Sequence, residues 1–166
     1  MPMNSKILLE VLKQEDLNKK RFPERQPLIK MLINEVSKWP EIEIYAHTYG
    51  GTEFRLFNKS IGHIHSNGML DLPFVKDIRK RLLDENLVQM HHINQTMNWV
   101  TKQIDCDDDL KAAKSLLLLS YFIKGQLYFD RFEQSSSFIH AKLLNCQFSE
   151  TIFATDILGK HLPQRK

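Results

Sequence analysis

The chain has 166 residues, of which 42% are hydrophobic and 26% are charged, and these proportions are typical of one globular domain with a sizeable core. The net charge of +3 is too small and too dispersed to indicate nucleic-acid binding, and two cysteines, Cys106 and Cys146, are too few for a disulfide framework. No stretch approaches the roughly 18–20 apolar residues of a membrane span, and no signal-peptide pattern opens the chain, so we expect a cytoplasmic protein with no membrane partner.

Two helices are predicted ahead of a sheet. Apolar residues recur at helical spacing over residues 5–18, where Ser5 is a suitable N-cap, and again from Pro27, which suits the first turn of a helix. The second helix is expected to end at Trp39, because a residue that precedes proline avoids the helical conformation. After residue 41 the apolar spacing changes from about 3.6 to 2, which predicts β-strands.

Five strands and further helices are predicted in the rest of the chain. The strands cover residues 42–47, 52–57, 61–65, 87–93 and 98–104, and short polar connections between the first three predict antiparallel hairpins. One helix opens at Pro73 and reaches about Asn86, and another begins at the acidic residues 107–109 and stops near Gly125. The stretch from residue 126 to residue 144 is also predicted to be largely helical.

The order of these elements predicts an α+β fold in a single domain. We expect an antiparallel sheet of about five strands with helices covering one of its faces. Residues 1–39 form a helical N-terminal segment and residues 125–166 a helical C-terminal tail.

The third predicted strand contains two histidines, His63 and His65, whose side chains leave the sheet on the same face. A two-residue turn before this strand would put them on the opposite face from Glu53 and Arg55. A three-residue loop would instead place Arg55 opposite His63 and Glu53 opposite His65. The loop is favoured, because the connection lacks the glycine that tight hairpin turns prefer. A carboxylate beside an imidazole raises its pKa and fixes its tautomer, so this face is predicted to carry an acid–base site.

Two further histidines, His91 and His92, are neighbours in a predicted strand and point to opposite faces, so only one of them is expected to join this site. His92 is preferred. The predicted catalytic residues are His63, His65, His92, Glu53 and Arg55, and the predicted ligand contacts are Asp71, His91 and Trp99. Asp71 precedes a predicted helix, so its alternative role is to cap that helix.

Three interpretations of this set remain open. The first is a metal site of His63, His65 and His92 with Glu53 or Asp71, because imidazole and carboxylate suit zinc or iron. The second, which is favoured, is a pocket without metal or other cofactor, where histidines bind or deprotonate a small acidic organic ligand. The third is that these histidines only contribute to structure.

Five motifs in this order carry a family resemblance. They are Gly51, Glu53, Phe54 and Arg55; Ile61, Gly62, His63 and His65; Asp71, Leu72, Pro73 and Phe74; His91 and His92 ahead of Trp99 and Val100; and Ser120 and Tyr121. The arrangement resembles the luciferase-domain family of bacterial and fungal proteins, which includes the fungal luciferase. The chain departs from the family where a proline and a Ser-Gly are usual, with Gln95 and Met97-Asn98 in their place.

The resemblance covers about residues 40–124 and implies a shared pocket. In the fungal enzyme the implied activity is oxidation of a polyketide-type luciferin by molecular oxygen without a cofactor, and the family pattern favours His92 over His91. We therefore expect this chain to bind or oxidise a small aromatic or enolic molecule. The alternative is a non-enzymatic small-molecule-binding or protein-interaction domain, for which Phe129, Phe132 and Phe138 are candidate partner contacts.

Overall fold

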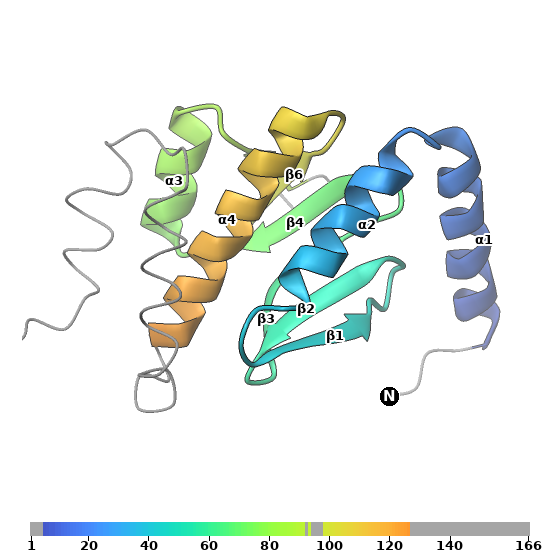
Figure 1. Ribbon diagram of the computed structural model, residues 1–166, viewed down its shortest axis with the longest axis horizontal. Helices are drawn as coiled ribbons and strands as arrows, with labels where there is room; N and C mark the ends of the chain where they lie inside the picture. Colours follow the sequence, from blue (N-terminus) through green and yellow to red (C-terminus); the bar gives the residue numbers. More distant parts are fainter. Residues whose placement is uncertain (1–4, 92, 94–97, 127–166) are drawn as a thin grey trace, which may run out of the picture.

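The computed structural model describes residues 5–91, 93 and 98–126. Along this part of the chain four helices and six strands follow one another (Figure 1). They are α1 (Ser5–Arg21), α2 (Arg25–Val36), β1 (Ile42–Ala46), β2 (Thr52–Leu56), β3 (Lys59–Ile64), β4 (Met69–Pro73), α3 (Lys76–Asp84), β5 (Gln89–Met90), β6 (Trp99–Gln103) and α4 (Asp107–Gln126). The helical tail predicted beyond residue 126 lies outside the described residues.

The predicted α+β fold is confirmed. The strands form one antiparallel sheet in the order β1-β2-β3-β4-β6-β5. The sheet has six strands rather than five, because β4 was not predicted. Its sequence carries Asp71 at the centre and Pro73 at the end, and proline there was taken for a helix start, whereas α3 begins three residues later at Lys76. Pro73 is the last residue of β4 and pairs with Trp99 of β6. The pairing of β4 with β3 involves Leu70 and Asp71, so the N–H that proline lacks is not needed for it.

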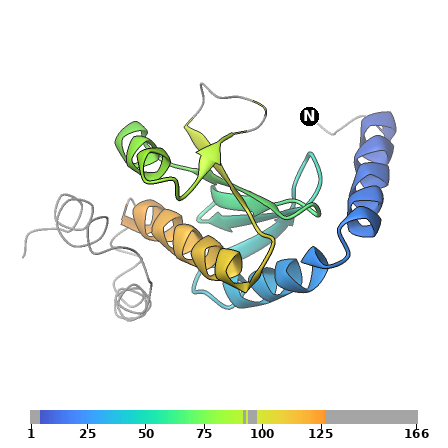
Figure 2. The same ribbon diagram turned by 90° about the horizontal axis from the view of Figure 1, so that it is seen from above.

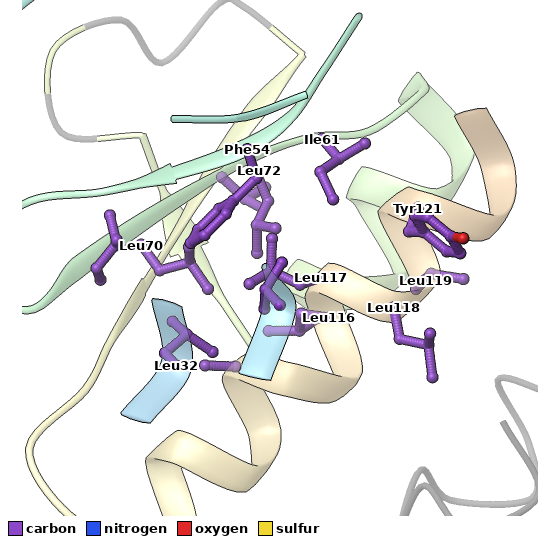
Figure 3. Close-up of a cluster of buried hydrophobic side chains, with 14 of the residues drawn as sticks. Leu32, Phe54, Ile61, Leu70, Leu72, Leu116, Leu117, Leu118, Leu119 and Tyr121 are labelled. Carbon is purple, nitrogen blue, oxygen red and sulfur yellow. The ribbon is translucent and has the colours of Figure 1, made fainter. Parts of the chain in front are cut away.

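Two helices, α2 and α4, lie along the same side of the sheet (Figure 2). The fully buried side chains between these layers come from the strands, from α2 and from α4, as Figure 3 shows. They include Leu32, Phe54, Leu56, Ile61, Leu70, Leu72, Leu117, Leu119 and Tyr121. Each such side chain contributes roughly 1.5–3 kcal/mol of burial free energy, so this layer holds the sheet in place. None of the described helices has the length and apolar composition needed to cross a membrane.

One contact joins the end of α2 to the far end of α4. The Tyr121 hydroxyl donates a hydrogen bond of 3.0 Å to the Pro40 carbonyl, and the Tyr121 ring packs edge-on against Trp39 at 5.4 Å between centroids. Both rings are buried. This contact fixes the point at which the chain leaves α2 and enters β1.

The hairpin between β2 and β3 differs from the predicted one. Its turn is Phe57-Asn58, where both residues have positive φ (48° and 62°), as a two-residue type I′ turn requires. Ile61 is an extra residue in β3, because Arg55 pairs with Ser60 while Phe54 pairs with Gly62. The predicted three-residue loop was therefore wrong.

Candidate functional site

A row of directly paired residues crosses the sheet on the face opposite α2 and α4. The register places Tyr45 opposite Glu53, Glu53 opposite His63, His63 opposite Asp71, Asp71 opposite Thr101, and Thr101 opposite Gln89. Residues that face each other in an antiparallel pair share one face. The bulge at Ile61 keeps His63 on the face of Glu53 even though the turn is shorter than predicted. Polar residues from five adjacent strands thus meet there, together with Tyr45 at one end.

Asp71 is the centre of this row, and its carboxylate is fully buried. Its Oδ2 lies 3.3 Å from Nε2 of His63, 3.3 Å from Nε2 of His65 and 3.6 Å from Nε2 of His91. Its Oδ1 accepts a hydrogen bond of 2.5 Å from the Thr101 hydroxyl. Three imidazoles from two separate parts of the chain therefore surround a single carboxylate oxygen.

The surroundings of Asp71 keep its carboxyl group ionised. Burial alone would raise the pKa of Asp71, but the contacts with His63 and His65 and the hydrogen bond from Thr101 bring this pKa far below its ordinary value. A buried anion is costly unless donors surround it. Because Asp71 carries its negative charge at neutral pH, it orients the imidazoles around it.

A fifth side chain, that of His47, completes what we call the Asp71 cluster: Asp71, His47, His63, His65 and His91. His47 directly follows β1, and its ring stacks on the His63 ring with 3.7 Å between centroids and 10° between planes. Burial, followed by the nearby His63 and His65, lowers the pKa of His47 to about 4 against the opposing effect of Glu53. His47 is therefore a neutral imidazole at physiological pH.

The sequence analysis gave His47 no role, although a signal was present. The alternation in residues 42–47 predicts that Glu43, Tyr45 and His47 share a face. The hairpin register pairs Tyr45 with Glu53, which is on the face of His63. Together, this shared face and this register would have placed His47 at the site.

Glu53 and Arg55 lie on the predicted face but form a pair with each other. Arg55 donates hydrogen bonds from Nε and Nη2 to Oε2 of Glu53, at 2.9 and 2.7 Å. Burial would raise the pKa of Glu53, but the bonds from Arg55 lower it overall. The carboxylate in contact with the imidazoles is therefore Asp71, and the Glu53–Arg55 pair borders the cluster.

Trp99 lies beside the cluster on the same side of the sheet, opposite Pro73 in the β4–β6 register. Its ring centroid is 5.1 Å from that of His63 and 6.3 Å from that of His91. Trp99 is half-buried. His92, the preferred partner in the sequence analysis, lies outside the described residues, so the choice between it and His91 stays a prediction.

The chemistry available to the Asp71 cluster is proton transfer, anion binding and metal ligation. Each of His47, His63 and His65 offers one ring nitrogen, and these three nitrogens all lie within 4.8 Å of one another. The buried Nδ1 of His63 has no hydrogen-bond partner among the described residues. Such a nitrogen carries either a lone pair or a hydrogen that a bound molecule can use.

Comparison with known proteins adds one finding. Neither the curated proteins nor the solved structures give a match. The family model of the luciferase domain matches residues 58–120, from the β2–β3 turn into α4. The matched stretch contains four members of the Asp71 cluster and Trp99, whereas His47 and Glu53 precede it. Over residues 58–120 the chain is similar to the luciferase domain, which confirms the resemblance predicted from its motifs.

Proposed function

We propose that the Asp71 cluster binds a small aromatic or enolic molecule and takes up a proton from it without an organic cofactor. The observation that carries this proposal is the position of three imidazoles around one buried, ionised carboxylate oxygen. Such a group of donors and acceptors suits an acidic hydroxyl, which gives up its proton to an imidazole and is then held as an anion.

The neighbours of the cluster fit a flat, electron-rich ligand. Trp99, at 5.1 Å from the His63 ring, offers an aromatic face beside the imidazoles. Arg55 is partly exposed, with 37% of its side-chain surface accessible, and adds positive charge near the row. An enolate or phenolate oxygen would be drawn toward the imidazoles while its ring packs against Trp99.

The oxidation that the family resemblance implies would follow from this proton loss. An imidazole removes the proton, and the resulting enolate is rich in electrons at carbon. Molecular oxygen then forms a bond with that carbon, so the carbon is oxidised and the oxygen is reduced to a peroxide. The protonated imidazole returns the proton to the peroxide. The enol O–H bond is thus broken, a C–O bond and a hydroperoxide O–H bond are formed, and the carbon that carried the enol hydroxyl becomes a carbonyl.

Binding is tested by a fluorescence titration, because Trp99 is one of only two tryptophans in the chain. The probes are catechol and a 4-hydroxy-2-pyrone. We expect saturable quenching in the natural protein, loss of this response in Asp71→Asn, and its retention in Asp77→Asn, an exposed carboxylate on α3. Equal titration curves for the natural protein and Asp71→Asn, or no saturable response to either probe, would contradict the proposal.

The oxidation step is tested by oxygen consumption with the probe that binds. We expect uptake of dioxygen at a rate that depends on Asp71 and is unaffected by Asp77→Asn. Binding without any oxygen uptake would leave a non-enzymatic binding domain, the alternative that the sequence analysis kept.

A protein-interaction role is the second candidate, and α1 favours it. Several apolar side chains of this helix are about half exposed: Ile7, Leu8, Leu9, Leu12 and Leu17. If α1 is an interaction surface, then changing Leu8 and Leu12 to Ser should leave probe binding unchanged and abolish self-association in light scattering. Probe binding that depends on these two leucines would argue against separate roles.

A further inference from the structure

We infer that Asp71, His63 and His65 together bind one divalent transition-metal ion. The inference rests on the proposed function, because it concerns the same cluster, and it deepens that function by naming what holds the ligand's oxygen atom. The sequence analysis favoured a site without metal and kept a metal site as an alternative. The distances around Asp71, together with the chemistry and burial of its neighbours, support the ion.

The contacts of His63 and His65 with Asp71 have the length expected between two ligand atoms of one metal ion. Nε2 of His63 and Nε2 of His65 are each 3.3 Å from Oδ2 of Asp71. Hydrogen bonds from nitrogen to oxygen ordinarily span about 2.7–3.2 Å. Two ligand atoms bound to the same ion at about 2.0–2.1 Å in a tetrahedral site lie about 3.3–3.4 Å apart. Both contacts therefore fit the edge of such a tetrahedron.

The side chains of Asp71, His63 and His65 also have the chemistry of metal ligands. Two imidazoles and one carboxylate are a common ligand set for zinc and for non-haem iron, and three protein ligands leave a coordination position open. Asp71 is fully buried and His63 is 6% exposed. A divalent cation neutralises the buried carboxylate charge, which imidazoles do only when they are protonated.

The two remaining histidines of the cluster are excluded from the ligand set by their geometry. The rings of His47 and His63 are parallel at 3.7 Å, so their nitrogen lone pairs lie in separate planes and cannot point at one ion. Nδ1 of His91 accepts a hydrogen bond of 3.4 Å from the Ile93 amide. Neutral His91 therefore carries its hydrogen on Nε2, where it faces Asp71 as a donor.

The ion would serve the proposed function directly. An enol or phenol oxygen that occupies its open position loses its proton at lower pH, because a divalent cation stabilises the anion. Binding and deprotonation would then occur at one place.

The test uses the full-length protein purified without a histidine tag, treated with a chelator and then titrated with Co²⁺. We expect one Co²⁺ per chain, with the intense visible bands of tetrahedral cobalt, and displacement by Zn²⁺. We also expect Zn²⁺ to raise the melting temperature, because a ligand that binds only the native state stabilises it. No saturable uptake, or only the faint bands of octahedral cobalt, would overturn the inference.

Variants assign the ligands. We expect His65→Gln and Asp71→Asn each to weaken Co²⁺ binding by at least tenfold, while His47→Gln, His91→Gln and Asp77→Asn retain stoichiometric uptake. Unchanged Co²⁺ affinity in both His65→Gln and Asp71→Asn would overturn the assignment. Circular dichroism establishes that each variant is folded, and if Asp71→Asn is not, His65→Gln and the spectrum of the natural protein still decide the matter.

The inference and the proposed function fail in different ways. Titrating the 4-hydroxy-2-pyrone into chelator-treated protein and into Zn²⁺-loaded protein separates them. Stronger binding to the loaded protein supports both. Equal binding to both forms overturns the role of the ion and leaves the proposed function intact, whereas Zn²⁺ uptake with no pyrone binding in either form overturns the proposed function and leaves the ion site intact.

Discussion

His63 on β3 faces Asp71 on β4 as a directly paired residue of the sheet, with 3.3 Å between Nε2 of His63 and Oδ2 of Asp71. Both side chains are buried. His65, which precedes Asp71 in the sequence, and His91, which follows it, also contact Oδ2 of Asp71. The sheet register therefore creates the cluster, and the strand that carries Asp71 is the one that the sequence analysis missed.

Asp71→Asn keeps the size of the side chain and removes its charge. Because the carboxylate is buried and accepts from Thr101, we expect the free energy of unfolding to fall by roughly 1–3 kcal/mol. Urea denaturation monitored by circular dichroism measures this change. The control Asp77→Asn, on an exposed site, should lie within about 0.5 kcal/mol of the natural protein. Equal stabilities for the two variants would show that Asp71 has no structural share in the cluster.

His63→Ala and His65→Ala should separate structure from binding. His63 is the more buried of the two and stacks on His47, so its removal should cost roughly 1–3 kcal/mol of stability, and that of His65 less. Both variants should lose the fluorescence response to the enolic probe. Thermal melts and probe titrations of each variant test this, and a His65→Ala protein that binds the probe normally would remove His65 from the site.

The fold was predictable where hydrophobic spacing is regular. The periodicity of residues 5–18 and 107–125 predicted helices that the structure contains as α1 and α4. β4 was missed because its pattern is short and its central residue is a buried carboxylate, which propensity alone assigns to a loop or cap. The Phe57-Asn58 turn was missed because an aromatic residue rarely adopts positive φ.

Gly51→Ala should disturb the turn that positions His47. Gly51 has φ of +88°, and a Cβ there would lie 2.1 Å from the Ile64 carbonyl oxygen. The Gly51 carbonyl also accepts a hydrogen bond of 3.1 Å from the His47 amide. We expect a loss of stability clearly beyond the roughly 1–2 kcal/mol that the backbone conformation alone costs.

Gly50→Ala is the matched control for this substitution. Gly50 has φ of +90°, but the atoms near its hypothetical Cβ belong to the Glu15 side chain, which can move. Its cost should therefore stay near the backbone term of roughly 1–2 kcal/mol. Chemical denaturation of both variants makes the comparison, and similar losses would mean that the Ile64 carbonyl does not constrain this turn.

The buried Tyr121 hydroxyl is expected to make the stability of the fold depend on pH. Burial, and then the Glu41 carboxylate, raise the pKa of Tyr121 above its ordinary value. In the unfolded chain a tyrosine hydroxyl ionises at about pH 10, whereas in the folded protein Tyr121 still holds its proton at that pH. The contribution of Tyr121 to the free energy of unfolding is therefore complete below about pH 10 and is lost as the pH rises further. Stability measured from pH 8 to pH 11 should fall in the natural protein.

Tyr121→Phe removes this titration and the hydrogen bond to the Pro40 carbonyl. At pH 8 the variant should be less stable by about 1 kcal/mol. Its stability should fall less steeply above pH 10 than that of the natural protein. Parallel curves for the two proteins across this range would contradict the role assigned to the Tyr121 hydroxyl.

The candidate site was predictable in part. The spacing of His63 and His65 and the alternation in β2 placed Glu53 and Arg55 on their face, and the register confirms this shared face. The sequence could not show that Arg55 forms an ion pair with Glu53, because that pair depends on the conformations of two side chains in the same strand. Nor could it show that Asp71 lies between the histidines, since this depends on the pairing of β3 with β4.

The central claim is that the histidines around Asp71 form one ligand-binding unit, and histidine side-chain NMR during titration with the 4-hydroxy-2-pyrone tests it most directly. The account predicts that the ring signals of His63, His65 and His91 shift together and saturate at one probe per chain, and that Asp71→Asn abolishes these shifts. Saturable binding that leaves these three rings unchanged would contradict the account.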